Sequence, residues 1–147
     1  MPDAGCSELP ITAREPAMFR EHEIEIRVRY QETDPMGFLH HANYFTYFEI
    51  GRTELLRAAG GNYREMEEQG LLVVVVEARC RFRQPARYDD LVKIRTTITR
   101  VTPAKILHEY QMLRDGQVLA VGNVTLAIID RDGKVCRVPD WMQFEGE

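Results

Sequence analysis

The stretch YQETDPMGFLHHANYFTYFE, Tyr30 to Glu49, places an acid, a proline, a glycine and two histidines directly before an aromatic run. Asp34 and Gly37 are of residue types that favour turns. The residues after Asn43 have the spacing of a helix with one apolar face. Two interpretations are open. The segment is a capped connection between a strand and a core helix, or the turn and the helix start together form an active site.

Composition narrows the class of protein. The chain has 147 residues, of which 44% are apolar and 29% charged, as expected for one soluble globular domain. The net charge of −4 argues against a nucleic-acid partner. The most apolar run, Leu71–Val76, is far shorter than the roughly 20 residues of a membrane-spanning helix. Three cysteines without CxxC spacing argue against a disulfide framework and a zinc site, and favour a cytoplasmic location.

The N-terminal residues lack the basic and apolar pattern of a signal peptide. We therefore expect residues 1–22 to be a loosely ordered lead-in and residues 23–147 to form a single domain. The domain begins with strict alternation in EIEIRVRY, which predicts a half-buried strand. A long helix follows, with Asn43 as its expected N-cap and Gly60-Gly61 as its expected end. A shorter helical segment, NYREMEEQG, comes next.

The remainder of the chain has strand patterns. LLVVVVEARCRFRQ is apolar on both faces at its start, which predicts a strand buried there and half-exposed later. LVKIRTTITRV alternates again, and Asp115-Gly116 and Asp132-Gly133 are two-residue hairpin signals. The expected order is a strand, a long helix, a short helix, and four or five mostly antiparallel strands. One long central helix wrapped by a curved antiparallel sheet is an α+β arrangement and the outline of a hot-dog fold.

Three segments carry a resemblance to a known family: RYQETDPMGFLHHANYFTYFEIGRTELLR, FRQPARYDDLVKIRT and GNVTLAIIDRDGKVCRVP. Together they resemble the 4-hydroxybenzoyl-CoA thioesterase family, and most of all its short-chain acyl-CoA branch associated with the Tol-Pal system. The similarity extends from Glu23 to Pro139. It implies hydrolysis of an acyl-CoA thioester to a free carboxylic acid and CoA.

The residues suit that chemistry independently of the resemblance. Thioester hydrolysis needs a nucleophile or a base, together with donors for the oxyanion. Asp34 offers a carboxylate, the first N–H groups of the helix near His41 are donors, and Gly37 keeps side chains away from the substrate. By resemblance, Asp34 is the catalytic aspartate, and the backbone N–H and imidazole of His41 belong to the site. Asp34 before proline is also a common turn residue, and His41 is also suited to a capping or core position.

Tyr44 and Glu49 are further candidates for substrate binding. Tyr44 is also suited to the core, and Glu49 to an exposed helix face. We expect no metal site, because adjacent histidines point apart and no HxxxH or HxH spacing occurs. The resemblance likewise implies no redox cofactor.

The CoA part of the substrate carries phosphates, so we expect basic side chains near the site. The candidates are Arg83, Arg87, Lys93, Arg95, Arg100 and Lys105, for each of which an ordinary solvated position is the alternative. The resemblance also implies a homodimer or homotetramer with each site at a subunit interface. Which of these residues contacts CoA is open.

Two other functions remain open from the sequence. A hot-dog hydratase or dehydratase acting on 3-hydroxyacyl thioesters pairs an acid with a histidine, which Asp34 and His41 could imitate. A non-catalytic module that binds acyl-CoA or acyl carrier protein would show binding without turnover. Met36 and Phe38-Leu39 are bulkier than is usual in the short-chain branch, so the acyl group is not determined.

Overall fold

The structure, a computed structural model, describes residues 20–143, and most of the predicted lead-in lies outside that range. The division of the chain at residue 22 therefore stays a prediction. The elements follow in the order β1 (Glu21–Arg27), η2 (Tyr30–Glu32), α1 (His41–Ala58), α2 (Tyr63–Glu68), β2 (Leu72–Phe82), β3 (Leu91–Val101), β4 (Ile106–Arg114), β5 (Gln117–Ile129), β6 (Val135–Cys136) and η3 (Asp140–Met142).

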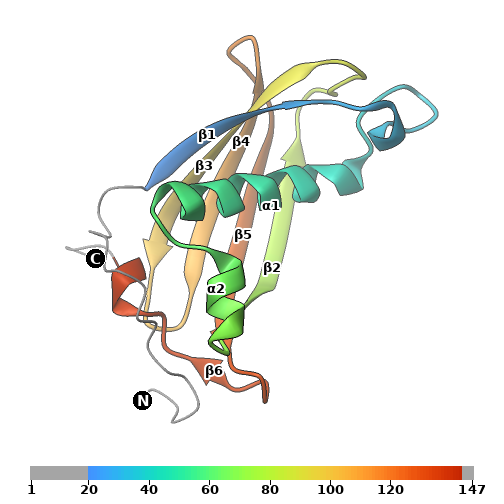
Figure 1. Ribbon diagram of the computed structural model, residues 1–147. Coiled ribbons are helices and arrows are strands. Elements are labelled where there is room, and N and C mark those ends of the chain that lie inside the picture. The colour runs from blue at the N-terminus through green and yellow to red at the C-terminus, as the bar shows by residue number, and fades with distance from the viewer. Residues whose placement is uncertain (1–19, 144–147) are drawn as a thin grey trace.

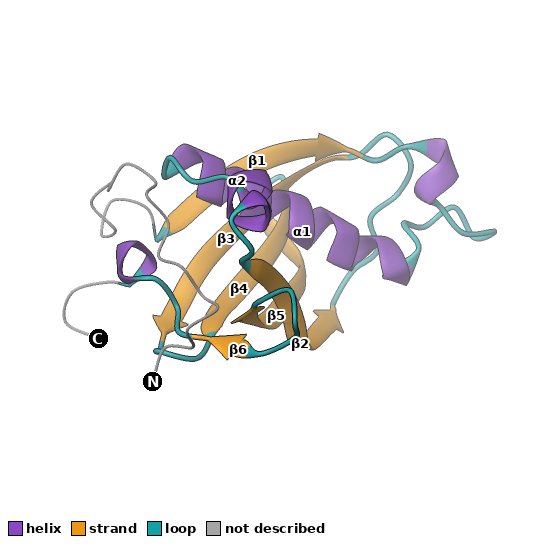
Figure 2. Cartoon of the chain, turned by 60° about the horizontal axis from the view of Figure 1, so that its bottom comes forward, coloured by secondary structure: helices purple, strands orange, loops and turns teal. Residues whose placement is uncertain are grey.

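One curved sheet holds all the strands. Its order is β1-β3-β4-β5-β2, with β6 paired to β5, and every pair is antiparallel. Figure 1 shows α1 crossing one face of the sheet, with α2 beside it. In Figure 2 the strands curve around α1. The α+β class and the hot-dog fold expected from the sequence are thus confirmed.

α1 is positioned by the apolar face that the sequence predicted. Its buried residues are Tyr44, Tyr47, Phe48, Gly51, Leu55 and Leu56. The cap prediction was wrong, because His40, not Asn43, is the N-cap: its imidazole accepts a hydrogen bond from the N–H of Ala42 at 3.1 Å. Asn43 lies inside the helix and donates its side-chain amide to the carbonyl of Glu32 at 2.9 Å. That contact joins the first turn of α1 to the preceding segment.

β1 and β2 differ from the sequence interpretation. β1 begins at Glu21 and ends at Arg27, since Tyr30 belongs to the short helix η2. β2 is an edge strand, so Val75 and Val76, expected to be buried, are 51% and 54% exposed. A run that is apolar on both faces predicts a buried strand, but it does not show which elements cover that strand. Within residues 20–143, nothing covers this part of β2.

The described residues contain no helix long and apolar enough to cross a membrane. Cys80 is a free thiol. Cys136 takes part in a disulfide bond. The expectation from the cysteine spacing, that the chain forms no disulfide, is therefore wrong. Without that expectation, the cysteines do not support a reducing compartment.

Candidate active site

The segment from Thr33 to Leu39 forms a tight loop that leads into α1. Its ends pair as an antiparallel bridge, Thr33 with Leu39. A second bridge joins Phe38 to Arg87, and the N–H of Leu39 donates to the carbonyl of Ala86 at 2.7 Å. The loop is thereby fastened to the segment after β2, which is more than forty residues away in the chain.

Asp34 occupies the start of this loop with one carboxylate oxygen engaged. Its Oδ1 accepts hydrogen bonds from the N–H groups of Met36 at 2.9 Å and Phe38 at 3.1 Å. Its Oδ2 accepts none from residues 20–143. Gly37 adopts φ +83°, a conformation that disfavours any side chain. The carboxylate therefore shapes the turn through one oxygen and leaves the other available.

The same turn occurs a second time in the protein, around Asp130. Its Oδ1 accepts from the N–H groups of Asp132 and Lys134, both at 2.9 Å, and Gly133 has φ +83°. Asp132 keeps a negative φ, so the expected two-residue turn of type I′ is absent here, whereas Asp115 and Gly116 do form one with φ of 52° and 79°. The turn at Asp34 is thus not by itself a mark of catalysis; its place before α1 is the distinguishing feature.

The start of α1 presents a backbone donor. The N–H of His41, the first residue of the helix, donates to no acceptor within residues 20–143. The side chain of His41 is exposed, and its ring stacks on that of His40 with centroids 4.2 Å apart. The expectation that the adjacent histidines point apart was wrong. Both rings lie together at the helix end.

Glu32, which sequence reasoning missed, fastens the loop to the helix. Its carboxylate is only 6% exposed and accepts hydrogen bonds from the N–H of Arg29 at 2.9 Å, the guanidinium of Arg29 at 3.0 Å and the hydroxyl of Tyr47 at 2.7 Å. Its carbonyl accepts from the N–H of His40 at 2.8 Å. Burial acts to raise the pKa of Glu32, but the hydrogen bonds from Arg29 and Tyr47 outweigh burial and lower the pKa below its usual value.

This lowered pKa predicts a contribution of Glu32 to stability that is lost in acid. The charged form is favoured in the folded state, so the contribution is present above the usual glutamate pKa of about 4.3. It disappears as the pH falls through the lower, folded pKa. We expect Glu32→Gln, which keeps the shape and two acceptor contacts, to flatten the decline of the urea midpoint below about pH 4.5. The control is Glu65→Gln, which removes an exposed carboxylate on α2. If the urea midpoint falls with pH equally steeply in wild type and in Glu32→Gln, the lowered pKa of Glu32 does not contribute to stability.

Tyr44 combines a core position with proximity to the site. It is 3% exposed, its ring meets Phe82 edge-on at 4.8 Å, and its hydroxyl lies 3.5 Å from the N–H of Ala86. Burial raises the pKa of Tyr44, and the charges of Cys80 and Asp34 add to the rise. Burial also raises the pKa of the Cys80 thiol to about 11. Asp34 and Cys80 each lie within electrostatic range of Tyr44, and Cys80 carried no signal of this in the sequence.

The other candidates are not brought to this loop. Glu49 is exposed on α1 eight residues after His41, which corresponds to about 12 Å along the helix. Lys93 and Arg95 line a shallow pocket on the outer face of the sheet, and Arg95 is bound to Glu23 at 2.8 Å. Arg100 lies at the other end of β3, roughly 24 Å from Lys93.

Lys105 lies in the hairpin that joins β3 to β4, next to the end of β3 that carries Arg100. These four basic candidates on and after β3 therefore form no single patch, whereas the guanidinium of Arg87 lies over the ring of Phe38 at the loop before α1. With respect to metals, residues 20–143 bring together no group of three histidine, cysteine, aspartate or glutamate side chains that could hold an ion.

Comparison with known proteins adds to this geometry. Residues 28–144 match the thioesterase-like superfamily. The chain is 35% identical over 106 residues to the acyl-CoA thioesterase YbgC of Haemophilus influenzae, covering 71% of this chain and 78% of that protein. Its fold is similar to a probable thioesterase from Bartonella henselae, with TM-score 0.78, 34% identity, and 81% and 99% of the two chains covered. It is also similar to the DHNA-CoA thioesterase of Staphylococcus aureus, with TM-score 0.78, 29% identity and 80% of each chain covered.

Proposed function

The chain belongs to the thioesterase-like superfamily and is a thioester hydrolase, and we propose that it hydrolyses an acyl-CoA to a free carboxylic acid and CoA at the loop before α1. Asp34 acts as nucleophile or general base, and the N–H of His41 polarises the thioester carbonyl. No metal or redox cofactor takes part. A cytoplasmic location belongs to the same proposal, because CoA thioesters are intracellular metabolites.

The observation that carries this proposal is the N–H of His41, which no acceptor within residues 20–143 occupies. It is the first of the N–H groups that a helix leaves without an internal partner, and the helix dipole makes that end attractive to negative charge. A carbonyl oxygen that becomes an oxyanion would gain from such a donor. The fastening of the loop by Glu32 and Ala86 keeps this end in a defined position relative to Asp34.

Asp34 is suited to the remaining task because Oδ2 is not engaged in the turn. That oxygen can attack the thioester carbon or take a proton from water. The leaving group needs little help, since a thiol with a pKa of about 8.5 departs readily as thiolate. One carboxylate and one set of backbone donors are therefore sufficient chemistry for the reaction.

A thiol-release assay tests the proposed function. Short, long, aromatic and β-keto acyl-CoAs are each incubated with the protein, and free CoA is measured with a thiol reagent. The aromatic members are included because the similar Staphylococcus aureus structure is a DHNA-CoA thioesterase. We expect release from at least one class. Crotonyl-CoA distinguishes hydrolysis from the hydratase alternative, because a hydratase adds water to it and yields a hydroxyacyl-CoA without free thiol. Formation of the hydroxyacyl-CoA, together with no thiol release from any acyl-CoA, would contradict hydrolysis.

The phosphate-binding role of the basic residues is tested with a truncated substrate. If Lys93, Arg95, Arg100 or Lys105 holds the CoA phosphates, its replacement by alanine should raise KM for acyl-CoA and leave KM for the corresponding acyl-pantetheine unchanged. Lys93 and Lys105 are the informative pair, because they lie at opposite ends of β3. Equal losses on both substrates would indicate a structural role instead.

Assembly into a homodimer or homotetramer is part of the proposal and is supported by the edge strand β2. An unpaired edge with the exposed side chains Val75 and Val76 is a surface that proteins normally cover. A second subunit is a suitable cover. We expect light scattering at micromolar concentration to give at least twice the chain mass of 17.0 kDa. A monomer would contradict the shared-site arrangement.

A further inference from the structure

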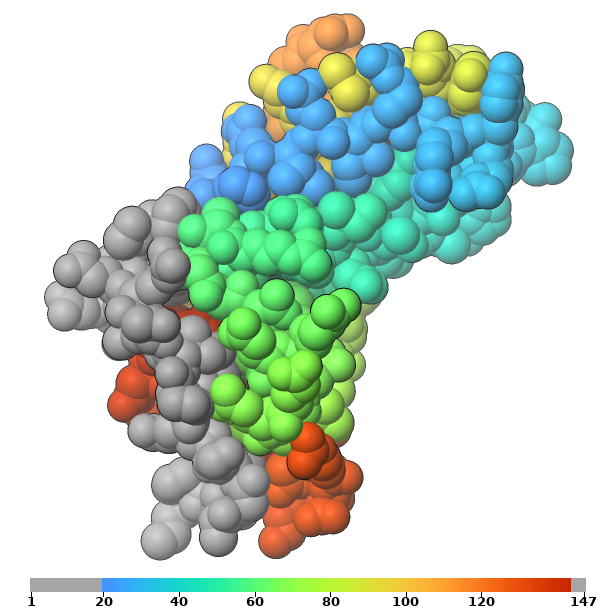
Figure 3. Space-filling view, viewed as in Figure 1, coloured from blue at the N-terminus to red at the C-terminus, as the bar shows by residue number. Residues whose placement is uncertain are grey.

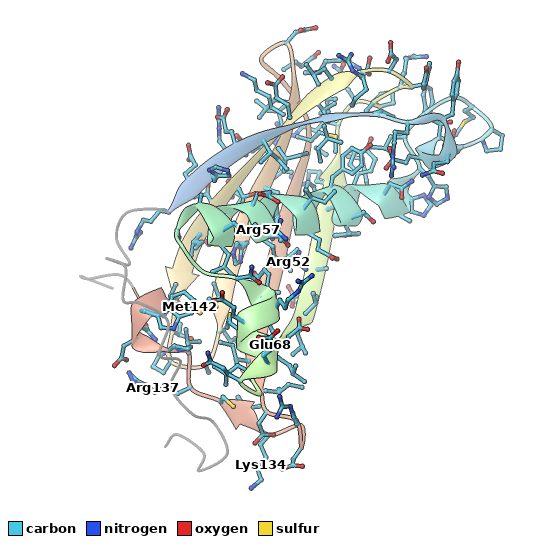
Figure 4. All side chains as sticks on the ribbon, viewed as in Figure 1. Arg52, Arg57, Glu68, Lys134, Arg137 and Met142 are labelled. Atoms are coloured by element: carbon cyan, nitrogen blue, oxygen red, sulfur yellow. The ribbon has the colours of Figure 1, made fainter. Side chains whose placement is uncertain are left out.

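A second pocket lies on the far half of α1, between α1, α2 and β2. Its volume is about 300 Å³, and its lining residues are Glu49, Arg52, Thr53, Tyr63, Glu67 and Val73. Figure 3 shows the C-terminal part of α1 and α2 meeting on one face of the molecule, and Figure 4 shows Arg52 on the side of α1 that faces α2. A pocket of this size can hold a small organic molecule.

Among the described residues that line this pocket, Arg52 is the one basic side chain, and it forms no close ion pair with any of them. No carboxylate of residues 20–143 lies within 4.0 Å of its guanidinium, although Glu49 and Glu67 line the same pocket. Arg57, one and a half turns further along the same helix, is by contrast paired with Glu54. The Arg52 guanidinium is thus partly buried and is not in direct contact with a carboxylate of the described residues, an arrangement that a bound anion would favour.

Two buried side chains near Arg52, outside the lining of the pocket, have polar atoms that lack partners within residues 20–143. The hydroxyl of Tyr110 and the Nδ1 of His108 are buried and form no hydrogen bond within the described residues, and the two side chains are 0% and 5% exposed. Arg52 lies near the Tyr110 hydroxyl, at a geometry that falls short of a hydrogen bond. Native proteins rarely leave such groups unsatisfied.

The electrostatic state of the side chains around Arg52 is set by burial and by the charge of Arg52. Burial raises the pKa of Tyr63 to about 12, against the opposing charge of Arg52. Burial and then the charge of Arg52 lower the pKa of His108 to about 3. At neutral pH both side chains are therefore uncharged, and Arg52 is the single cation of the cluster.

This pocket is separate from the proposed reaction site within one chain. Arg52 is eleven residues after His41 on α1, which places it about 16 Å further along the helix. The lining residues include none of the loop from Thr33 to Leu39. The pocket is thus a distinct feature of the molecule.

We propose that this pocket binds a carboxylate, with the Arg52 guanidinium as counter-charge and the Tyr63 hydroxyl as a hydrogen-bond donor. A guanidinium matches the planar carboxylate in a two-point contact. A ligand with a single negative charge fits better than a dianion such as phosphate, because the repulsion by Glu49 and Glu67 in the same lining grows with the charge of the ligand. Val73 gives the body of the ligand a small apolar contact.

A carboxylate can reach the pocket from two sources. It is either a free carboxylic acid or, in the proposed oligomer, the distal carboxylate of an acyl group attached to CoA at the reaction site of another subunit, because the reaction site of the same chain is about 16 Å away along α1. Only the second source rests on the proposed function. Both share the chemistry recognised by Arg52, and the experiment has one arm for each.

The first arm measures binding by isothermal titration of the full chain with sodium butyrate. Butyramide, of similar shape and without charge, is the ligand control. We expect butyrate but not butyramide to bind, and Arg52→Gln to weaken butyrate binding by roughly tenfold or more. Arg57→Gln, an arginine on the same helix outside the pocket, should bind as wild type does. Tyr63→Phe leaves the charge of Arg52 in place and removes one hydrogen-bond donor, so it should weaken butyrate binding by a smaller factor than Arg52→Gln does.

The second arm measures thiol release from glutaryl-CoA and pentanoyl-CoA, which differ in the distal carboxylate. If the acyl group supplies the carboxylate, Arg52→Gln should lower kcat/KM for glutaryl-CoA only. If a free acid supplies the carboxylate, Arg52→Gln leaves kcat/KM for glutaryl-CoA unchanged and still weakens butyrate binding in the first arm. Equal binding of butyrate and butyramide, or no binding to either together with equal effects of Arg52→Gln on the two thioesters, would overturn the proposal. Retained release from pentanoyl-CoA shows that the hydrolase itself is intact.

Discussion

Replacing Asp34 with asparagine is expected to lower kcat for acyl-CoA hydrolysis by at least roughly a hundredfold, because the amide is a poor nucleophile and cannot act as a general base. General-base catalysis alone is typically worth about 10²–10⁴-fold. KM should change little, since the carboxylate acts on the reacting carbon and not on the CoA moiety. The amide oxygen of asparagine can still accept from the N–H groups of Met36 and Phe38, so the turn should survive. Steady-state thiol release and a thermal melt measure the two properties.

Asp130→Asn is the matched control for that experiment. Asp130 forms the same turn, with N–H donors two and four residues ahead and a glycine with φ +83° three residues ahead. The two variants therefore disturb equivalent hydrogen bonds, and only one of them lies before α1. If Asp34→Asn stays folded and keeps more than about a tenth of the wild-type kcat, Asp34 serves the turn alone.

Gly122→Ala is expected to destabilise the protein by about 1–3 kcal/mol. Gly122 lies on β5 beneath the ring of Phe48, and an added Cβ would lie 2.3 Å from Phe48 Cε2. Phe48 cannot simply move aside, because its other contacts include a stack on Tyr110 at 4.7 Å. The melting temperature should fall by roughly 3–10 °C. Differential scanning calorimetry gives the shift directly.

Two controls isolate the steric cause. Asn123→Ala lies next to Gly122 on the same strand, with its side chain on the face away from α1, and should change stability by no more than about 0.5 kcal/mol. Phe48→Leu removes the ring that the new Cβ meets, so the Gly122→Ala and Phe48→Leu changes should be less than additive. Additive losses would mean that Gly122 does not limit the approach of α1 to the sheet.

Several features of the site could be predicted from neighbouring residues alone. The turn from Asp34 to Gly37 and the hairpin at Asp115-Gly116 each depend on residues within four positions of one another, and such chemistry is visible in a sequence. The cap of α1 was the local error. Asn43 is the better cap by residue type, but its side chain is used to join α1 to Glu32, and His40 takes its place.

The features that the sequence did not show depend on residues far apart in the chain. Glu32 meets Tyr47 fifteen positions later, and Ala86 meets Leu39 forty-seven positions earlier. Glutamate in a polar segment has the pattern of an exposed side chain, so its burial could not be inferred. The same holds for Arg52, whose pocket is formed by α2 and β2.

The sequence by itself determined the order of the elements, the apolar face of α1 and the residue types at the start of the helix, because each follows from a period or a turn preference within a few residues. Only the tertiary structure decided that β2 is the sheet edge, that Glu32 fastens the loop carrying Asp34, and that Arg52 lies in a pocket formed by α1, α2 and β2. An alternating pattern shows which face of a strand is buried but carries no information about its neighbours. The neighbours are selected by the packing of the whole chain around α1.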